Sequence, residues 1–208
     1  MYAERVKPFR LLYKLLLHFD SNLCYLFSFG KEEYKATFPN EYALAHKFLV
    51  KCGIDKGEEI LSAQKQVDYI DVLIITTNYL LIIEDKVYSN EHDDQIIRYV
   101  RNVGSDNAKF SSDKKIKVCY LKTGDYVKSY TPTDDILSDE DCCSLRRHDL
   151  IELLKDCHQD KIMNMFYDHL LKVEKEIENY IKQIKNKKKT FNWKLFLVTL
   201  ILYIYIIV

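Results

Sequence analysis

Residues 67–100, VDYIDVLIITTNYLLIIEDKVYSNEHDDQIIRYV, contain two apolar runs that are joined by a short polar turn. The runs cover residues 67–76 and 79–87 and are rich in Ile, Val and Leu, which favours buried strands. Because only Thr77-Asn78 separates them, we expect the two strands to pair as a hairpin. A polar, acidic start then indicates a helix from Ser89 to about residue 102.

The rest of the chain combines helices with one further strand. Helical spacing of apolar residues predicts helices at 6–29, 41–51, 148–157 and 161–185, and an apolar run predicts a strand at 115–121. Residues 133–141 are polar and are expected to form a loop. This order predicts an α/β fold with a mixed central sheet of four or five strands, flanked by helices.

The composition excludes several classes of protein. A chain of 208 residues suits one domain. Thirty-one basic residues balance thirty-one acidic ones, so that any site for a polyanion must be a local patch. The six cysteines show no regular spacing and no CxxC pair, which favours reduced thiols over a disulfide scaffold or a zinc site. The charged amino terminus does not resemble a signal peptide, and we expect a cytoplasmic protein.

Charged residues at the end of the second apolar run are the main functional signal. Side chains alternate along a strand, so Glu84 and Lys86 point to one face and Asp85 points to the other. Asp71 lies across the turn, where its carboxylate can approach Glu84; Asp68 is a second candidate, although its position favours a solvated residue. Two converging carboxylates repel unless a cation lies between them. Oxygen ligands of this kind suit Mg²⁺ or Mn²⁺.

The same residues resemble a known pattern. Asp71, the triplet Glu84-Asp85-Lys86 and the helical pair Gln95-x-x-x-Tyr99 are similar to the core of the PD-(D/E)XK nuclease superfamily, in the branch where Gln-x-x-x-Tyr follows Glu-x-Lys. The likeness covers about residues 31–181. It implies a restriction-endonuclease-like core and metal-dependent hydrolysis of phosphodiester bonds by an endonuclease, with DNA as the substrate.

The resemblance also implies roles for individual side chains. Asp71 and Glu84 would bind Mg²⁺ or Mn²⁺, Lys86 would orient the attacking water, and Gln95 would support it. The candidates for contact with nucleic acid are Arg98, Tyr99 and Arg101.

An early glutamate often completes the metal site in this superfamily. Glu41 is our first choice for that ligand and Glu33 is its rival, because the residues that would decide between them are missing here. This departure keeps two alternatives open. One is a catalytically inactive binding module, either tethered to a membrane or bound to nucleic acid, and the other is a decayed gene product that folds poorly.

The carboxyl-terminal end differs from the rest. Residues 1–185 are expected to form the nuclease-like domain, and residues 186–208 a basic and then hydrophobic tail. The run 195–208 has fourteen residues, about 21 Å as a helix, whereas a bilayer core needs about 30 Å. We weigh a short membrane anchor against a buried final element and against a truncated end. As an anchor, the tail would place three apolar side chains in the lipid, Leu195, Leu200 and Ile204.

Overall fold

The computed structural model describes residues 19–86, 95–104, 113–123, 138–157 and 160–187. Its helices and strands are, in chain order, α2 (Phe19–Ser28), the 3-10 helix η1 (Glu32–Tyr34), α3 (Pro39–Lys51), β1 (Ile60–Val67), β2 (Ile70–Thr76), β3 (Tyr79–Asp85), α4 (Gln95–Gly104), β4 (Lys115–Lys122), the 3-10 helix η2 (Asp139–Asp141), β5 (Cys142–Arg146), α5 (Arg147–Leu154) and α6 (Lys161–Lys187).

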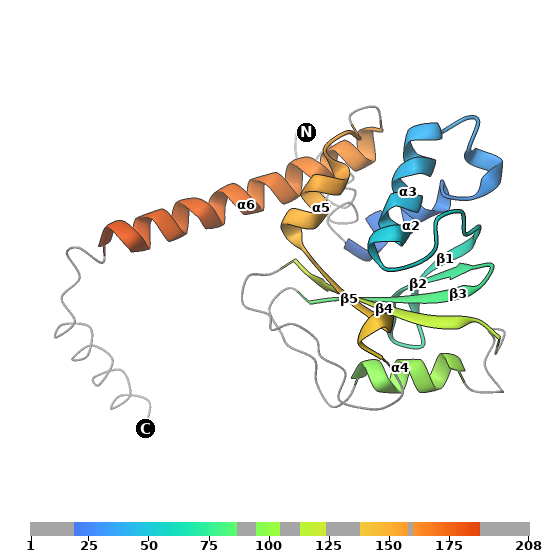
Figure 1. Cartoon of the computed structure of the whole chain (residues 1–208). Helices are drawn as coiled ribbons and strands as arrows, with labels where there is room; N and C mark the ends of the chain where they lie inside the picture. The colour runs from blue at the N-terminus through green and yellow to red at the C-terminus, as the bar shows by residue number, and fades with distance from the viewer. Residues whose placement is uncertain (1–18, 87–94, 105–112, 124–137, 158–159, 188–208) are drawn as a thin grey trace, which may run out of the picture. The chain divides into compact units, whose positions relative to one another are not determined.

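The five strands form one mixed sheet in the order β1-β2-β3-β4-β5 (Figure 1). β1, β2 and β3 are successive antiparallel neighbours, whereas β3, β4 and β5 are parallel. This is the expected restriction-endonuclease-like α/β fold. Because the last three strands run in the same direction, their carboxyl ends meet at one edge of the sheet. Near these carboxyl ends, Glu84 of β3 is aligned with Tyr120 of β4, which is in turn aligned with Ser144 of β5.

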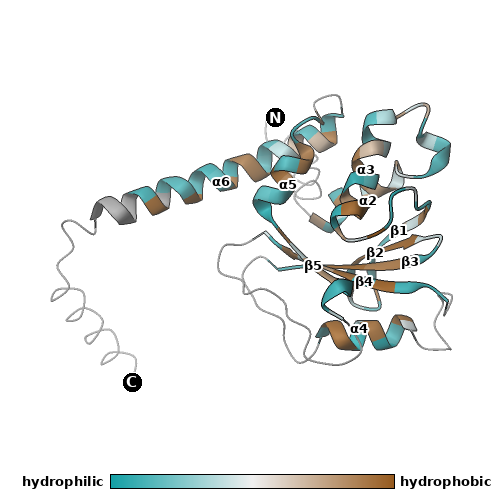
Figure 2. Ribbon diagram, viewed as in Figure 1, coloured by the Kyte–Doolittle hydropathy of each residue, from teal (hydrophilic) through white to brown (hydrophobic). Residues whose placement is uncertain are grey.

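Both faces of the sheet are covered, which explains why the central strands are apolar over most of their length (Figure 2). On one face, Leu81 and Ile83 of β3 pack with α2, α3, α5 and the start of α6. On the other face, Leu80 and Ile82 pack against α4, the helix drawn below the sheet in Figure 1. Strand alternation therefore sends odd-numbered and even-numbered residues of β3 to different helical layers.

The structure shortens one expected strand and contains two that were not expected, β1 and β5. The expected strand at 67–76 corresponds to β2, which begins only at Ile70, whereas Val67 is the last residue of β1 and a turn joins the two. In this turn Asp68 and Tyr69 have φ values of 50° and 71°, a conformation that propensity does not favour for such residues. β5 begins where the expected polar loop ends, and only Leu145 of its five residues is fully buried, so it carried little apolar signal.

The expected helices agree with the structure more closely. α3 begins at Pro39, two residues before the expected start at residue 41, because proline is suited to the first helical position. The carboxyl end of that helix is closed by Gly53, at a φ of 74°. Of the helix expected at 6–29, residues 19–28 are described as α2, and the start of the helix expected at 89–102 lies outside the described residues.

The sheet and its helices belong to a compact unit that ends at Leu170, within α6. The start of α6 is anchored in that unit by Met163, Phe166 and Leu170. Among the helices that the structure describes, none is both long enough and apolar enough to span a bilayer. The tail residues expected as a membrane anchor lie outside the described residues.

Gly30 follows α2 and is packed closely against Ala45 of α3 and Ile60 of β1. A Cβ atom there would lie 2.9 Å from Ala45 Cβ and would also clash with Ile60 Cδ1. We expect Gly30→Ala to lower the free energy of unfolding by about 1–3 kcal/mol, because the core would be overpacked. Thermal melting measures the effect. Gly104→Ala is the control: its added Cβ would meet Ile116 Cδ1 at 3.3 Å, and it should melt close to the wild type. Equal melting temperatures for both variants would contradict the prediction.

Candidate active site

Two carboxylates meet where β2 begins and β3 ends. Val72 is aligned with Ile83 in this antiparallel pair, which places Asp71 beside Glu84 on the sheet face that α4 covers. Burial and, after it, the charge of Asp71 raise the pKa of the Glu84 carboxyl group, as expected for neighbouring carboxylates. The Asp85 backbone N–H donates to Asp71 Oδ2 at 2.9 Å and fixes that carboxylate against β3.

A lysine and an amide complete the polar cluster on this face. Lys86 Nζ lies 2.7 Å from Glu84 Oε1. Gln95 of α4 joins both groups: its Nε2 donates to Glu84 Oε1 at 2.9 Å, and its Oε1 accepts from Lys86 Nζ at 2.9 Å. The Gln95 amide also contacts the Tyr99 hydroxyl one turn later. The helical pair that the sequence suggested therefore holds the strand residues in place.

Burial makes this cluster electrostatically unfavourable in the absence of a cation. Glu84 is only 2% exposed, and burial raises the pKa of its carboxyl group to about 7, although Lys86 opposes the shift. The pKa of Asp71 is raised for the same reason, and Asp20 adds to the shift. Several carboxylates thus share one lysine, a combination that favours binding of a cation or a proton.

Asp85 points to the other face and has a different set of partners. Its Oδ1 accepts from Thr123 Oγ1 at 2.8 Å, and Arg147 Nη1 donates to the Thr123 carbonyl at 2.6 Å. Burial raises the pKa of Asp85 to about 7, and the charges of Asp71 and Asp20 add to this shift. Asp85 therefore links the end of β3 to the end of β4 and the start of α5.

The structure does not bring the expected early glutamates to this cluster. Glu41 lines a pocket with Leu153 and Cys157 of the α3–α5 region, and Glu33 is exposed in η1. The early acid whose charge acts on both Asp71 and Asp85 is Asp20, in the first turn of α2. Asp20 could not be singled out from the sequence, because the predicted helix begins at residue 6, which gives residue 20 no special position.

The turn between β1 and β2 borders the cluster. Asp68 is exposed there, and it shares a hollow of about 580 Å³ with Asp71, Gln66 and Tyr69. The Tyr69 side chain is 88% exposed. Asp68 is thus a solvated neighbour of Asp71, as its position in the sequence suggested.

The expected nucleic-acid contacts are at different places along α4. Arg98 is exposed, and its charge acts on the Tyr99 hydroxyl, close to Gln95. Tyr99 is buried, so its role is to pack and to hold Gln95. Arg101 lines a separate hollow of about 820 Å³ at the amino end of β4, with Lys114 and Lys115.

The donor atoms of the cluster fit a hard divalent cation. Glu84 Oε1 is engaged by Lys86 and Gln95, whereas Glu84 Oε2 is buried without a hydrogen-bond partner among the described residues. A buried carboxylate oxygen without a partner is costly. Asp71 offers a second carboxylate beside it. Two carboxylates with a hollow open to solvent suit Mg²⁺ or Mn²⁺, which keep water ligands, better than a soft metal.

Comparison with known proteins gives one result. A family model described as the PD-(D/E)XK nuclease superfamily matches residues 36–199, which include the whole sheet, Asp71, Glu84, Lys86 and α4. No curated protein and no solved structure matches the chain significantly.

The raised pKa of Glu84 predicts how the free energy of unfolding depends on pH when a chelator keeps the site free of metal ions. The pKa of Glu84 in the folded state, about 7, exceeds its ordinary value of 4.5, so the folded state holds this proton more tightly than the unfolded state does. The stability that the protonated Glu84 contributes is therefore fully present below about pH 4.5 and is lost as pH rises through 7. Glu84→Gln removes this loss, while the Asp71 carboxylate still acts on the charge of Lys86. The variant should therefore have a free energy of unfolding at pH 8 that is higher by roughly 1–3 kcal/mol, with a smaller gain at pH 5.

Thermal melting in EDTA at the two pH values measures this difference. Glu33→Gln is the control, since Glu33 is exposed, and it should change neither value. Added Mg²⁺ should stabilise the wild type more than Glu84→Gln. A variant that melts below the wild type at pH 8 in EDTA would contradict the prediction.

Proposed function

Since this chain belongs to the PD-(D/E)XK nuclease superfamily, we propose that it is a metal-dependent endonuclease that hydrolyses phosphodiester bonds in DNA. The observation that carries the proposal is the buried Glu84 carboxylate, which has one oxygen bound to Lys86 and the other without a partner among the described residues. Such an arrangement is unfavourable for a merely structural ion pair. It is favourable for a site that binds a cation beside a lysine.

Asp71 and Glu84 would hold the ion, Mg²⁺ or Mn²⁺. The bound ion supplies charge for the scissile phosphate and lowers the pKa of a bound water. Asp20 carries a further negative charge close to Asp71. It replaces Glu41 as our candidate for the early acid, either as a ligand or through a water.

Lys86 is the residue that we assign to the attacking water and to the negative charge that develops on the phosphate. Its Nζ is held by Glu84 Oε1 and by Gln95 Oε1, so its position is fixed before substrate binds. A fixed cation of this kind stabilises a transition state without reorganisation. Gln95 is a positioning residue, because it acts through Lys86 and Glu84.

Tyr69 and Arg98 are our candidates for contacts with the substrate. Tyr69 and Asp71 border the same hollow, and Tyr69 is almost fully exposed. Its φ of 71° is a strained conformation for a bulky residue, at a cost of about 1–3 kcal/mol, which is more often found at functional sites. An exposed ring beside a phosphate site can stack on a base, and Arg98 can contact a phosphate.

The decisive experiment is cleavage of plasmid, linear and single-stranded DNA by the full chain, with Mg²⁺, with Mn²⁺ and with EDTA. We expect cleavage only with a metal ion. Lys86→Met should reduce the rate by at least about 100-fold, because the transition state loses a fixed charge. Lys35→Met is the matched control, since Lys35 pairs with Glu32 at the surface, and it should cleave as the wild type does.

Cleavage that persists in EDTA, or in Lys86→Met at the wild-type rate, would refute this assignment. A folded protein that binds DNA and Mg²⁺ without cleaving would instead favour the inactive binding module.

The contribution of Tyr69 is tested separately with binding measurements. In a Glu84→Gln background, Tyr69→Ala should weaken binding of a fluorescent single-stranded oligonucleotide about tenfold, because base stacking contributes roughly 1–3 kcal/mol. Tyr69→Phe keeps the ring and is expected to bind as the parent does. Fluorescence anisotropy measures both, and equal affinities for the Ala and Phe variants would contradict the stacking role.

A further inference from the structure

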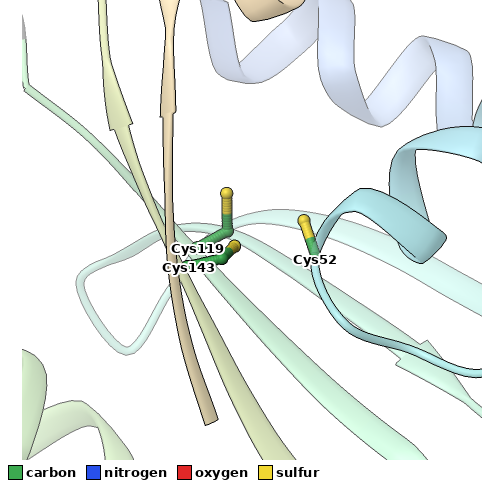
Figure 3. A group of neighbouring side chains, drawn as sticks. All are labelled: Cys52, Cys119 and Cys143. Atoms are coloured by element: carbon green, nitrogen blue, oxygen red, sulfur yellow. The ribbon is translucent and has the colours of Figure 1, made fainter. Parts of the chain in front are cut away.

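Three cysteine side chains converge on the face of the sheet opposite the candidate active site. Cys52 follows the last turn of α3, Cys119 is in β4 and Cys143 is in β5. Their Sγ atoms all lie within 4.8 Å of one another. Figure 3 shows the three side chains beside one another. Residues separated by 91 positions in the sequence thus form one cluster of sulfur atoms.

The fold fixes the position of all three. Cys119 and Cys143 are directly aligned in the parallel pair of β4 and β5. Cys52 is held at the end of α3, where its N–H donates to the carbonyls of Phe48 and Leu49. Cys52 and Cys119 are buried in the core formed with α2 and α3, and Cys143 is partly buried against that core. The cluster is therefore preorganised.

The cluster is separate from the carboxylate site. Cys119 is aligned with Ile83, whose side chain packs in the layer of α2 and α3. Glu84, the next residue, faces α4 with Lys86 and Gln95. The same central strands therefore carry carboxylate oxygens on one face and sulfur atoms on the other.

Sulfur is a soft ligand that favours thiophilic metal ions over Mg²⁺. Burial raises the pKa of the Cys52 and Cys119 thiols, whereas hydrogen bonds from these two thiols lower the pKa of Cys143. Lys117 is the cation that acts on Cys143. Three thiolates and one divalent ion leave a net charge of −1, which Lys117 would offset.

We propose that Cys52, Cys119 and Cys143 bind one Zn²⁺ ion. Zn²⁺ is four-coordinate in most protein sites. Among the described residues, no fourth Cys, His, Asp or Glu joins the group, and we assign the fourth position to a water molecule. Cys143 is only partly buried, and it marks the side from which the ion and this water enter. The ion ties the end of α3 to β4 and β5.

The test uses the full chain, purified with a reducing agent and without a chelator, and then loaded with Zn²⁺ or with Co²⁺ as a spectroscopic probe. We expect one tightly bound Zn²⁺ per chain by elemental analysis. The Co²⁺ form should show thiolate-to-cobalt charge transfer, a band that oxygen ligands such as Asp71 and Glu84 do not produce. This signature distinguishes the thiol site from the carboxylate site, and it does not depend on nuclease activity.

Cys143→Ser should abolish the charge-transfer band and weaken Zn²⁺ binding by more than the roughly 10–100-fold typical of residues that only support a ligand. Cys142→Ser is the matched control, because Cys142 is the adjacent, half-buried cysteine and packs against the opposite core. It should keep the band and the ion. Circular dichroism shows whether each variant is folded.

A folded wild-type chain that shows no charge-transfer band with Co²⁺ and no bound Zn²⁺ would overturn the proposal, even if Cys143→Ser fails to fold. A band of equal strength in Cys143→Ser and Cys142→Ser would also overturn it. So would a disulfide between two of the three cysteines that resists the reducing agent, detected by peptide mass spectrometry.

Discussion

The ion pair between Glu84 and Lys86 is the interaction around which the site is organised. Its two groups, 2.7 Å apart, lie at the end of a strand that is otherwise apolar and buried. Neither group could stay charged there alone, because desolvation would be too costly. Gln95 from α4 bonds to both groups, and Asp71 from β2 adds a second carboxylate. One lysine cannot balance the carboxylates, and this imbalance is the basis for cation binding.

The topology explains why such a site forms at this edge. The antiparallel pair of β2 and β3 aligns Asp71 with Glu84, and the parallel pair of β3 and β4 places Thr123 beside Asp85. Both layers of helices then supply further groups: α4 supplies Gln95 and Tyr99, and α2 supplies the charge of Asp20. Each partner comes from a different element, so that small changes in packing would change the electrostatics of the site.

The hairpin of β2 and β3 could be predicted from the sequence because the features that indicate it lie close together in the chain. Two apolar runs two residues apart must pair, and strand alternation alone places Glu84 and Lys86 on one face. β5 could not be predicted from the sequence, because its residues are mostly polar or half-buried and its pairing with β4 is what defines it as a strand. β1 was missed for a related reason: its burial pattern is irregular, and the chain leaves it through residues with positive φ.

The sequence by itself determined the fold class, and the resemblance of its motifs indicated the family. Periodicity and short spacings also indicated which residues share a face, Glu84 with Lys86 on the strand and Gln95 with Tyr99 on the helix. Only the tertiary structure decided which early acid approaches Asp71, because Asp20 reaches it across the packing of α2 on the sheet. The cysteine cluster also depends on the tertiary structure alone. Its members have no regular spacing in the sequence, and strand register and the end of α3 bring their sulfur atoms together.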